Sequence, residues 1–284
     1  MRRTLYISDL DGTLLDSYSR VSPTTVTLLN HAISEGALFS VATARTPATV
    51  SYLLKDVDLR IPLVVMTGAA LWDKETGAYS EVQYFTPEKV NEIIEAYRRP
   101  EGGGGFLYTL ARRDGRDLME IYHLGPLNDI ERSFMTERLS SPYKRFFVPE
   151  SGISEIPDTI DNAVLFFGMK EEGIAQKIRE GLNRISGINP MFYHDWHGDE
   201  IAEVEAFPIG ATKAKAIKRL REKVGADRVV VFGDNMNDLT MMGIADWSVA
   251  VANAVSDVKY AADEVIGSNA ADAVARYILE DIRR

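Results

Sequence analysis

The sequence predicts an α/β protein in which a doubly wound, Rossmann-like parallel sheet forms the core and an α+β domain is inserted into it. Short apolar strands alternate with helical stretches over the first eighty residues and again from about residue 210. Between these parts, hairpins and helices replace the alternation. The 284 residues suffice for two domains of ordinary size. We expect a core of residues 1–84 and 198–284, and an insert of residues 85–197.

The first part of the chain justifies the parallel sheet element by element. An apolar strand is predicted over residues 4–10. The stretch 22–36 is predicted to be a helix, because Ser22 can cap it, Pro23 suits its first turn and Gly36 can end it. The next elements follow the same alternation: a strand at 37–45, a helix at 47–56 and a strand at 62–73.

The middle of the chain has a different character. A capped amphipathic helix at 86–99 is followed by a run of four glycines, and residues 106–124 read as a hairpin around an Asp-Gly turn. The remaining elements expected there are helices at 128–139 and 172–186 and strands at 162–169, 188–195 and 200–206. The alternation then returns with helices at 212–224, 236–243, 255–262 and from 270, and strands at 228–234 and 247–253.

Composition excludes several classes of function. A net charge of −10 argues against nucleic acid as a partner, because phosphate backbones require clustered Lys and Arg. The absence of cysteine excludes disulfides, a thiolate nucleophile and Cys-ligated zinc. The apolar run at the N-terminus is interrupted by Asp9, unlike a signal peptide, and no stretch reaches the roughly 20 apolar residues that span a bilayer. We expect a cytoplasmic protein with no membrane partner; its oligomeric state is not encoded in any recognisable pattern.

Polar residues follow four of the predicted strands. They are Asp9 and Asp11, then Thr43, then the Thr67-Gly68 pair, and finally the segment 233–238. Ligands bind outside the carboxyl ends of strands in an open parallel sheet, so these residues are expected to share one crevice.

Four of these residues are acids whose mutual repulsion requires a cation. Asp9, Asp11, Asp234 and Asp238 would converge there, and an oxygen-only ligand set favours a hard ion, for which Mg²⁺ is our prediction. A site that holds Mg²⁺ and also needs Lys213 has something more negative to neutralise, and a phosphate monoester fits.

A carboxylate is the natural nucleophile, since the chain has no cysteine and no histidine near these motifs. Asp9 would attack phosphorus to give an aspartyl phosphate that water then hydrolyses. Asp11 would be the general acid for the leaving oxygen and later the base for water. Gly12 would permit the turn that brings backbone N–H groups to the phosphoryl oxygens.

At these residues the chain resembles the haloacid dehalogenase superfamily of phosphatases. "DLDGTLLD" resembles its first motif, Thr43 in "VATAR" its second, Lys213 in "GATKAKAI" its third, and "GDNMND" its fourth. The tail "VAVANAVSDVKYAADEV" is similar to that of the Cof-type subfamily, whose type IIB cap lies between the second and third motifs, where the insert falls.

The resemblance implies a role for each matching residue. Asp9 is implied as nucleophile and metal ligand, Asp11 as acid/base that gives its backbone carbonyl to the metal, and Asp234 and Asp238 as acids that bind the metal directly or through water. The phosphoryl group would be held by the amides of Leu10 and Ala44, the Thr43 hydroxyl, Lys213 and Asn237. The family commonly has Gly where this chain has Ala44, which leaves the amide available and adds a methyl group to the pocket. The implied substrate is a small phosphorylated metabolite, such as a sugar phosphate, under a specificity-determining cap.

Two other functions fit parts of this pattern. A phosphotransferase or phosphomutase would use the same intermediate and pass the phosphoryl group to a hydroxyl. A non-enzymatic phospho-aspartate switch, such as a flavodoxin-like receiver, also has an acidic Mg²⁺ pocket, but receivers are single domains without a large insert.

Two further features are assigned no catalytic role. The segment "HDWHGDE" at 194–200 has two histidines three residues apart, but no third histidine lies near, so a junction or cap surface is favoured over zinc. Trp196 or His197 could instead line a substrate pocket. Arg45 is left open as structural or substrate-facing.

Overall fold

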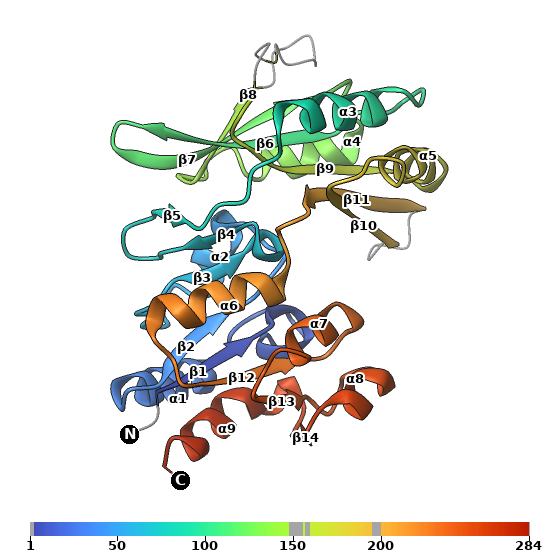
Figure 1. Ribbon diagram of the computed structural model, residues 1–284. Helices are drawn as coiled ribbons and strands as arrows, with labels where there is room; N and C mark the ends of the chain where they lie inside the picture. The colour runs from blue at the N-terminus through green and yellow to red at the C-terminus, as the bar shows by residue number, and fades with distance from the viewer. Residues whose placement is uncertain (1–2, 148–155, 157–159, 195–199, 284) are drawn as a thin grey trace. The chain divides into compact units, whose positions relative to one another are not determined.

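The computed structural model describes residues 3–147, 156, 160–194 and 200–283. The chain divides into two compact units, one of residues 1–81 with 212–284 and one of residues 82–211 (Figure 1). Each unit has its own sheet and its own buried core.

A parallel sheet organises the first unit. Its strands lie in the order β14-β13-β12-β1-β2, and every neighbouring pair is parallel. A bridge between Ala42 and Val64 continues this parallel pairing to β3. The strand bounds are β1 Thr4–Ser8, β2 Leu38–Val41, β3 Leu63–Val65, β12 Arg228–Gly233, β13 Trp247–Ala250 and β14 Glu264–Val265.

The direction of winding reverses next to β1. From β1 the chain continues to β2 on one side, whereas β12 pairs with the other side of β1 and leads on to β13 and β14. In a doubly wound sheet this switch point opens a crevice beyond the carboxyl ends of the strands. The fold therefore places the ends of β1 and β12 where a ligand can bind.

The helices of this unit begin and end where local chemistry dictates. Ser22 accepts a hydrogen bond from the Thr25 amide and Pro23 starts α1, as its sequence predicted. Thr212 caps α6, and Gly225 ends it in the left-handed conformation. The helix bounds are α1 Pro23–Ser34, α2 Pro47–Leu53, α6 Lys213–Val224, α7 Leu239–Met242, α8 Ser256–Ala261 and α9 Ala273–Asp281.

The single strand expected at 62–73 is two strands. β3 ends at Val65, and a 3₁₀ turn over Met66–Gly68 reverses the chain into β4 (Ala70–Trp72), which pairs antiparallel with β3. A second short strand, β5 (Tyr79–Ser80), continues this hairpin. All three turn residues have positive φ, which an apolar run does not signal.

The second unit is built on a mostly antiparallel six-stranded sheet in the order β10-β11-β9-β6-β7-β8. The expected hairpin is β6 and β7, with Asp114 and Gly115 both at positive φ in its turn. The bounds are β6 Phe106–Arg113, β7 Arg116–His123, β8 Lys144–Phe147, β9 Ala163–Glu171, β10 Ile188–His194, β11 Ile201–Pro208, α3 Pro87–Arg98, α4 Asp129–Thr136 and α5 Glu172–Leu182. The parallel edge strand β8 was not predicted.

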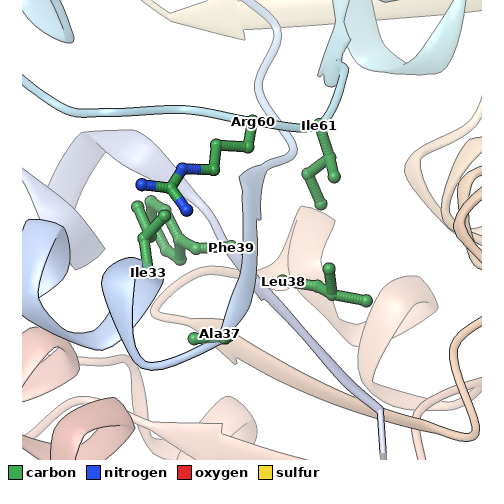
Figure 2. Close-up of a pocket in the computed structure, with 7 residues that line it drawn as sticks. Ile33, Ala37, Leu38, Phe39, Arg60 and Ile61 are labelled. Carbon is green, nitrogen blue, oxygen red and sulfur yellow. The ribbon is translucent and has the colours of Figure 1, made fainter.

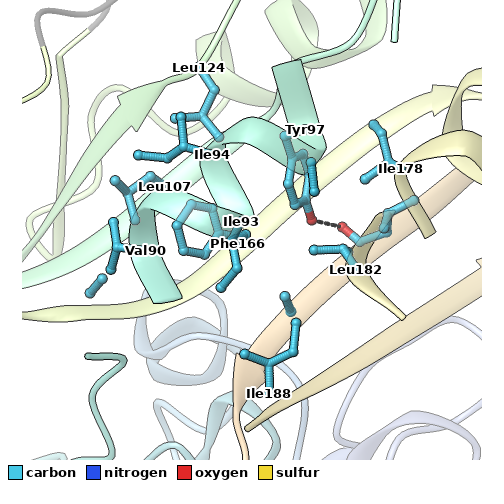
Figure 3. Close-up of a cluster of buried hydrophobic side chains, with 14 of the residues drawn as sticks. Val90, Ile93, Ile94, Tyr97, Leu107, Leu124, Phe166, Ile178, Leu182 and Ile188 are labelled. Atoms are coloured by element: carbon cyan, nitrogen blue, oxygen red, sulfur yellow. Dashed lines mark hydrogen bonds between the residues drawn. The ribbon is translucent and has the colours of Figure 1, made fainter. Parts of the chain in front are cut away.

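Helices α3 and α5 cover one face of this sheet. Val90 and Tyr97 of α3 and Ile178 of α5 pack with Phe166 and other apolar residues of the sheet (Figure 3). Tyr97 is fully buried, and its hydroxyl donates a hydrogen bond of 2.9 Å to the Val204 carbonyl oxygen (Figure 3). The second unit thus has an independent core.

The return from the insert lies later than the sequence suggested. The strand at 200–206 was expected among the elements of the middle region, and β11 does pair with β10 and β9 there; the boundary at residue 198 was placed too early, since the second unit extends to Ala211. The mixed α/β fold class with its parallel sheet is confirmed. Across the described ranges, the structure has no helix with the length and apolar character that crossing a bilayer requires.

Candidate active site

Asp9 lies directly after β1, at the switch point of the parallel sheet. Its amide donates a 3.0 Å hydrogen bond to the Phe232 carbonyl oxygen of β12, which holds the backbone of Asp9 against that strand. The residue is 7% exposed. A buried carboxylate requires compensating partners, and the surrounding residues supply them.

The strongest of these partners is Lys213, the first residue of α6. Its ammonium donates to Asp9 Oδ1 at 2.5 Å and to Asp238 Oδ1 at 2.8 Å, and it is 4% exposed. Burial works against the ammonium, but the carboxylates of Asp9 and Asp238 outweigh it and raise the pKa of Lys213. The cation is therefore held charged between two acids.

The segment after β12 supplies the other acids. Asp238 is fully buried, and its Oδ2 accepts hydrogen bonds from the amides of Asp234 and Asn235 at 3.1 and 3.2 Å. Asp234 Oδ1 accepts a 2.7 Å hydrogen bond from the Thr13 hydroxyl. Burial raises the pKa of Asp234.

The turn after Asp11 brings the two acidic segments together. Gly12 has φ of 81°, and a Cβ atom there would collide with the Asp234 carboxylate. Glycine is thus required for conformation and for the close approach of the backbone. Thr13, the next residue, was missed by the sequence analysis; its place beside Gly12 was the available signal.

The acids fit a divalent metal ion. Asp9, Asp234 and Asp238 can each offer a carboxylate oxygen, and these oxygens all lie within 4.8 Å of one another. An all-oxygen donor set of this kind suits Mg²⁺. Burial raises the pKa of Asp9 to about 7, with Lys213 opposing and Asp238 reinforcing the rise. Part of the repulsion within this cluster remains for a cation to relieve.

The side chain of Asp11 is not a member of this group. Arg45 holds it through two hydrogen bonds, Nε to Oδ2 at 2.7 Å and a terminal nitrogen to Oδ1 at 2.6 Å. The bond to Asp11 raises the pKa of Arg45. A role of Asp11 in metal binding through its main-chain carbonyl, as the resemblance implied, therefore stays a prediction, while Arg45 gains a defined partner.

The predicted phosphate-binding residues occupy neighbouring positions. Thr43 is 1% exposed, at the end of β2, and its hydroxyl accepts from the Arg45 amide at 3.1 Å. Leu10 is buried, Ala44 is half-buried and Asn237 is exposed. The phosphate-binding roles that the sequence assigned to their amides and side chains stay predictions.

Other candidate features lie elsewhere. A hollow of about 140 Å³ is lined by Ile33, Gly36, Ala37, Leu38, Phe39, Arg60 and Ile61 (Figure 2). Because β2 begins at Leu38, this hollow is at the amino end of the strand, opposite to Thr43. The segment 195–199, with Trp196 and His197, lies outside the described residues, so neither the zinc alternative nor a pocket role is tested.

Comparison with known proteins agrees with this geometry. A family model described as haloacid dehalogenase-like hydrolase matches residues 6–278. The chain is 25% identical over 272 residues to the pyridoxal phosphate phosphatase of Escherichia coli K12, covering 95% of each. It is 23% identical over 275 residues to the 5-amino-6-(5-phospho-D-ribitylamino)uracil phosphatase of Bacillus subtilis 168, covering 95% of this chain and 92% of that protein.

A solved structure supports the fold as well. The chain is similar to a sugar phosphatase of haloacid dehalogenase subclass IIB, with a TM-score of 0.69, 20% identity and 98% of each chain covered. At this identity the likeness supports the architecture, a Rossmann-like core with an inserted second domain.

Proposed function

We propose, from the premise that the chain belongs to the haloacid dehalogenase-like hydrolase family, that it hydrolyses small phosphate monoesters through an aspartyl phosphate on Asp9. The observation that carries this proposal is the environment of Asp9. It is a buried carboxylate that Lys213 binds directly and that shares a metal-sized cluster with Asp234 and Asp238. The phosphatase names of two relatives with near-complete coverage support the same reaction.

The proposed reaction assigns two steps to two acids. A carboxylate oxygen of Asp9 attacks phosphorus, and the bond to the leaving oxygen breaks as Asp11 gives that oxygen a proton. Asp11 then takes a proton from water, whose oxygen attacks phosphorus and releases inorganic phosphate from Asp9. In the structure Asp11 is bound to Arg45, so acting on substrate requires Asp11 to exchange this partner.

The other proposed site residues would mainly neutralise and orient the charged phosphoryl group. Lys213 would offset the phosphoryl charge, and the Thr43 hydroxyl, the Leu10 and Ala44 amides and Asn237 would orient its oxygens. Asp9, Asp234 and Asp238 would hold Mg²⁺, which supplies charge neutralisation and in-line orientation of the phosphoryl group when bound. The second unit would set substrate specificity, as the resemblance implied for the insert.

The test is phosphate release across a panel of esters, with and without Mg²⁺. The panel includes pyridoxal phosphate, the ribitylaminouracil phosphate and several sugar phosphates. We expect turnover that a chelator abolishes and added Mg²⁺ restores. No release from any ester would contradict the proposal, and transfer to an added hydroxyl acceptor in preference to water would favour a phosphotransferase.

A substitution of Asp11 tests for the aspartyl phosphate intermediate. Asp11→Asn should slow both steps and leave a phosphoryl group on Asp9, detectable by mass spectrometry of the acid-quenched protein. Asp16→Asn is the matched control, because Asp16 lies in the same segment and its Oδ1 accepts hydrogen bonds from the nearby amides of Tyr18 and Arg20. The control should retain wild-type turnover.

A further inference from the structure

A buried hydroxyl at the end of β3 has no role in the reaction described so far. Thr67 is 5% exposed, and its Oγ1 has no hydrogen-bond partner among the residues that the structure describes. Burying a hydroxyl without a partner costs on the order of 1–3 kcal/mol. The sequence analysis singled out this residue only as a polar strand end.

The backbone of the same residue is strained. Thr67 has φ of 55° and follows Met66 at 51°. Among the described non-glycine residues with positive φ, Thr67 is the one with a β-branched side chain, for which the left-handed region is least favourable. Two energetic costs therefore coincide at one position, a pattern typical of functional sites.

The strained turn is tied to the segment after β2. The Thr67 amide donates to the Thr43 carbonyl oxygen at 2.9 Å, and the Met66 amide donates to that of Arg45 at 3.1 Å. Thr67 is thus fixed beside the residues proposed to bind the phosphoryl group and to hold Asp11.

The other side of the turn meets α6. A Cβ atom on Gly68 would collide with the Thr212 carbonyl oxygen, and Arg219 of α6 donates to the Gly68 carbonyl oxygen at 2.9 Å. Thr212 directly precedes Lys213. The turn therefore lies between two segments that carry active-site residues.

Strand spacing indicates which part of a substrate Thr67 would meet. β2 lies beside β1, and β3 lies beside β2, so the end of β3 is roughly 10 Å from the end of β1 across the sheet. A phosphoryl group on Asp9 would not extend that far, so only the leaving group of an ester could meet Thr67.

We propose that the Thr67 hydroxyl is a specificity contact that hydrogen-bonds a hydroxyl group on the leaving group of the ester. This rests on the proposed function and deepens it, because it names polyol phosphates as the favoured substrate class. The bound substrate supplies the partner that the buried hydroxyl lacks. A site built around such a hydrogen bond discriminates against esters that cannot make it.

The test is Thr67→Val, which keeps the β-branch and deletes the hydroxyl. We expect kcat/KM for the best hydroxyl-bearing ester to fall about tenfold, mainly through KM. For p-nitrophenyl phosphate, whose leaving group has no further hydroxyl, kcat/KM should change less than twofold. Thr67→Ser should retain most of the wild-type preference for the hydroxyl-bearing ester.

A stability measurement separates this role from a structural one. Without ligand, Thr67→Val should melt no lower than the wild type, because it removes an unpartnered buried group. A lower melting temperature, equal losses with both esters, no loss with either, or a wild type that prefers esters without hydroxyl groups would each overturn the assignment. Absence of any ester hydrolysis by the wild type would instead contradict the proposed function itself.

Discussion

Two lysines, one in each unit, are buried to nearly the same extent and surrounded in opposite ways. Lys213 is 4% exposed and Lys144 of β8 is 5% exposed. Lys213 is bound by the carboxylates of Asp9 and Asp238. Lys144 lies over aromatic rings instead, 5.3 Å from the Tyr108 centroid and 5.9 Å from that of Phe134, with no ion pair among the described residues.

The two environments shift the pKa of the ammonium group in opposite directions. Carboxylates raise the pKa of Lys213 against the effect of burial. Burial, with help from nearby Arg138, lowers the pKa of Lys144 to about 7. The comparison teaches that burial alone does not decide the charge of a lysine; the charged groups around the ammonium decide whether its pKa rises or falls.

The largest effect is expected from the substitution of Asp9, the acid bound to Lys213. Asp9→Asn should reduce turnover by at least about 10³-fold, because the nucleophile is lost. Steady-state phosphate release measures this, and circular dichroism checks that the fold is intact. Turnover within tenfold of the wild type would refute the assignment of the nucleophile.

Replacing each lysine by methionine tests whether the two buried ammonium groups differ in function. Lys213→Met should lower kcat/KM at least about 10²-fold and, without Mg²⁺, destabilise the protein by roughly 3–5 kcal/mol, because two buried acids lose their partner. Lys144→Met should preserve turnover and, near pH 7, stabilise the protein by on the order of a few kcal/mol, because it removes a buried ammonium that no carboxylate offsets among the described residues. Urea denaturation and phosphate release are the measurements, and similar effects of the two substitutions would show that the two lysines do not differ in function.

The lowered pKa of Lys144 predicts how the stability of the protein depends on pH. Lys144 titrates near 7 when folded and near its ordinary pKa of about 10.4 when unfolded, so between these values the unfolded state binds more protons. The free energy of unfolding should therefore rise with pH from 7 towards 10, by on the order of a few kcal/mol. Urea denaturation at several pH values measures this rise, and a slope unchanged in Lys144→Met would contradict it.

The smallest effect is expected from the hydrogen bond that orients Asp234. Thr13→Val deletes the hydroxyl that donates to Asp234 Oδ1 and should raise the Mg²⁺ concentration for half-maximal activity about tenfold. Thr13→Ser, which keeps the donor, is the control. An unchanged Mg²⁺ requirement would show that Asp234 needs no such support.

Elements with strong local signals were predictable from sequence. The helix at Ser22-Pro23 and the Asp114-Gly115 hairpin follow from caps and turn residues, which act over a few positions. The end of a strand at Thr67-Gly68 was indicated by its polar residues, but the reversal into β4 was not predictable, because the turn depends on tertiary contacts with Thr43, Arg45 and α6. The strand that became β11 was assigned to the middle region, but the boundary at residue 198 separated it from that region, because no change of composition marks the return to the first unit.

The candidate site shows the same division. Asp9, Asp234 and Asp238 follow from strand ends in a parallel sheet and do converge, with Lys213 among them. The pairing of Arg45 with Asp11 was not foreseen, since it depends on side-chain conformations across two loops. The orphan hydroxyl of Thr67 is likewise visible only in a folded chain.

The pairing of β1 with β12 has a consequence for biosynthesis. Residues 4–8 acquire this neighbour from residues 228–232, which leave the ribosome only after the whole second unit has been made. The second unit can complete its sheet from contiguous sequence while the opening strand still lacks one edge. The pairing of β1 with β12 thus joins the segment that carries Asp9 to its second neighbour only after the second unit has been translated.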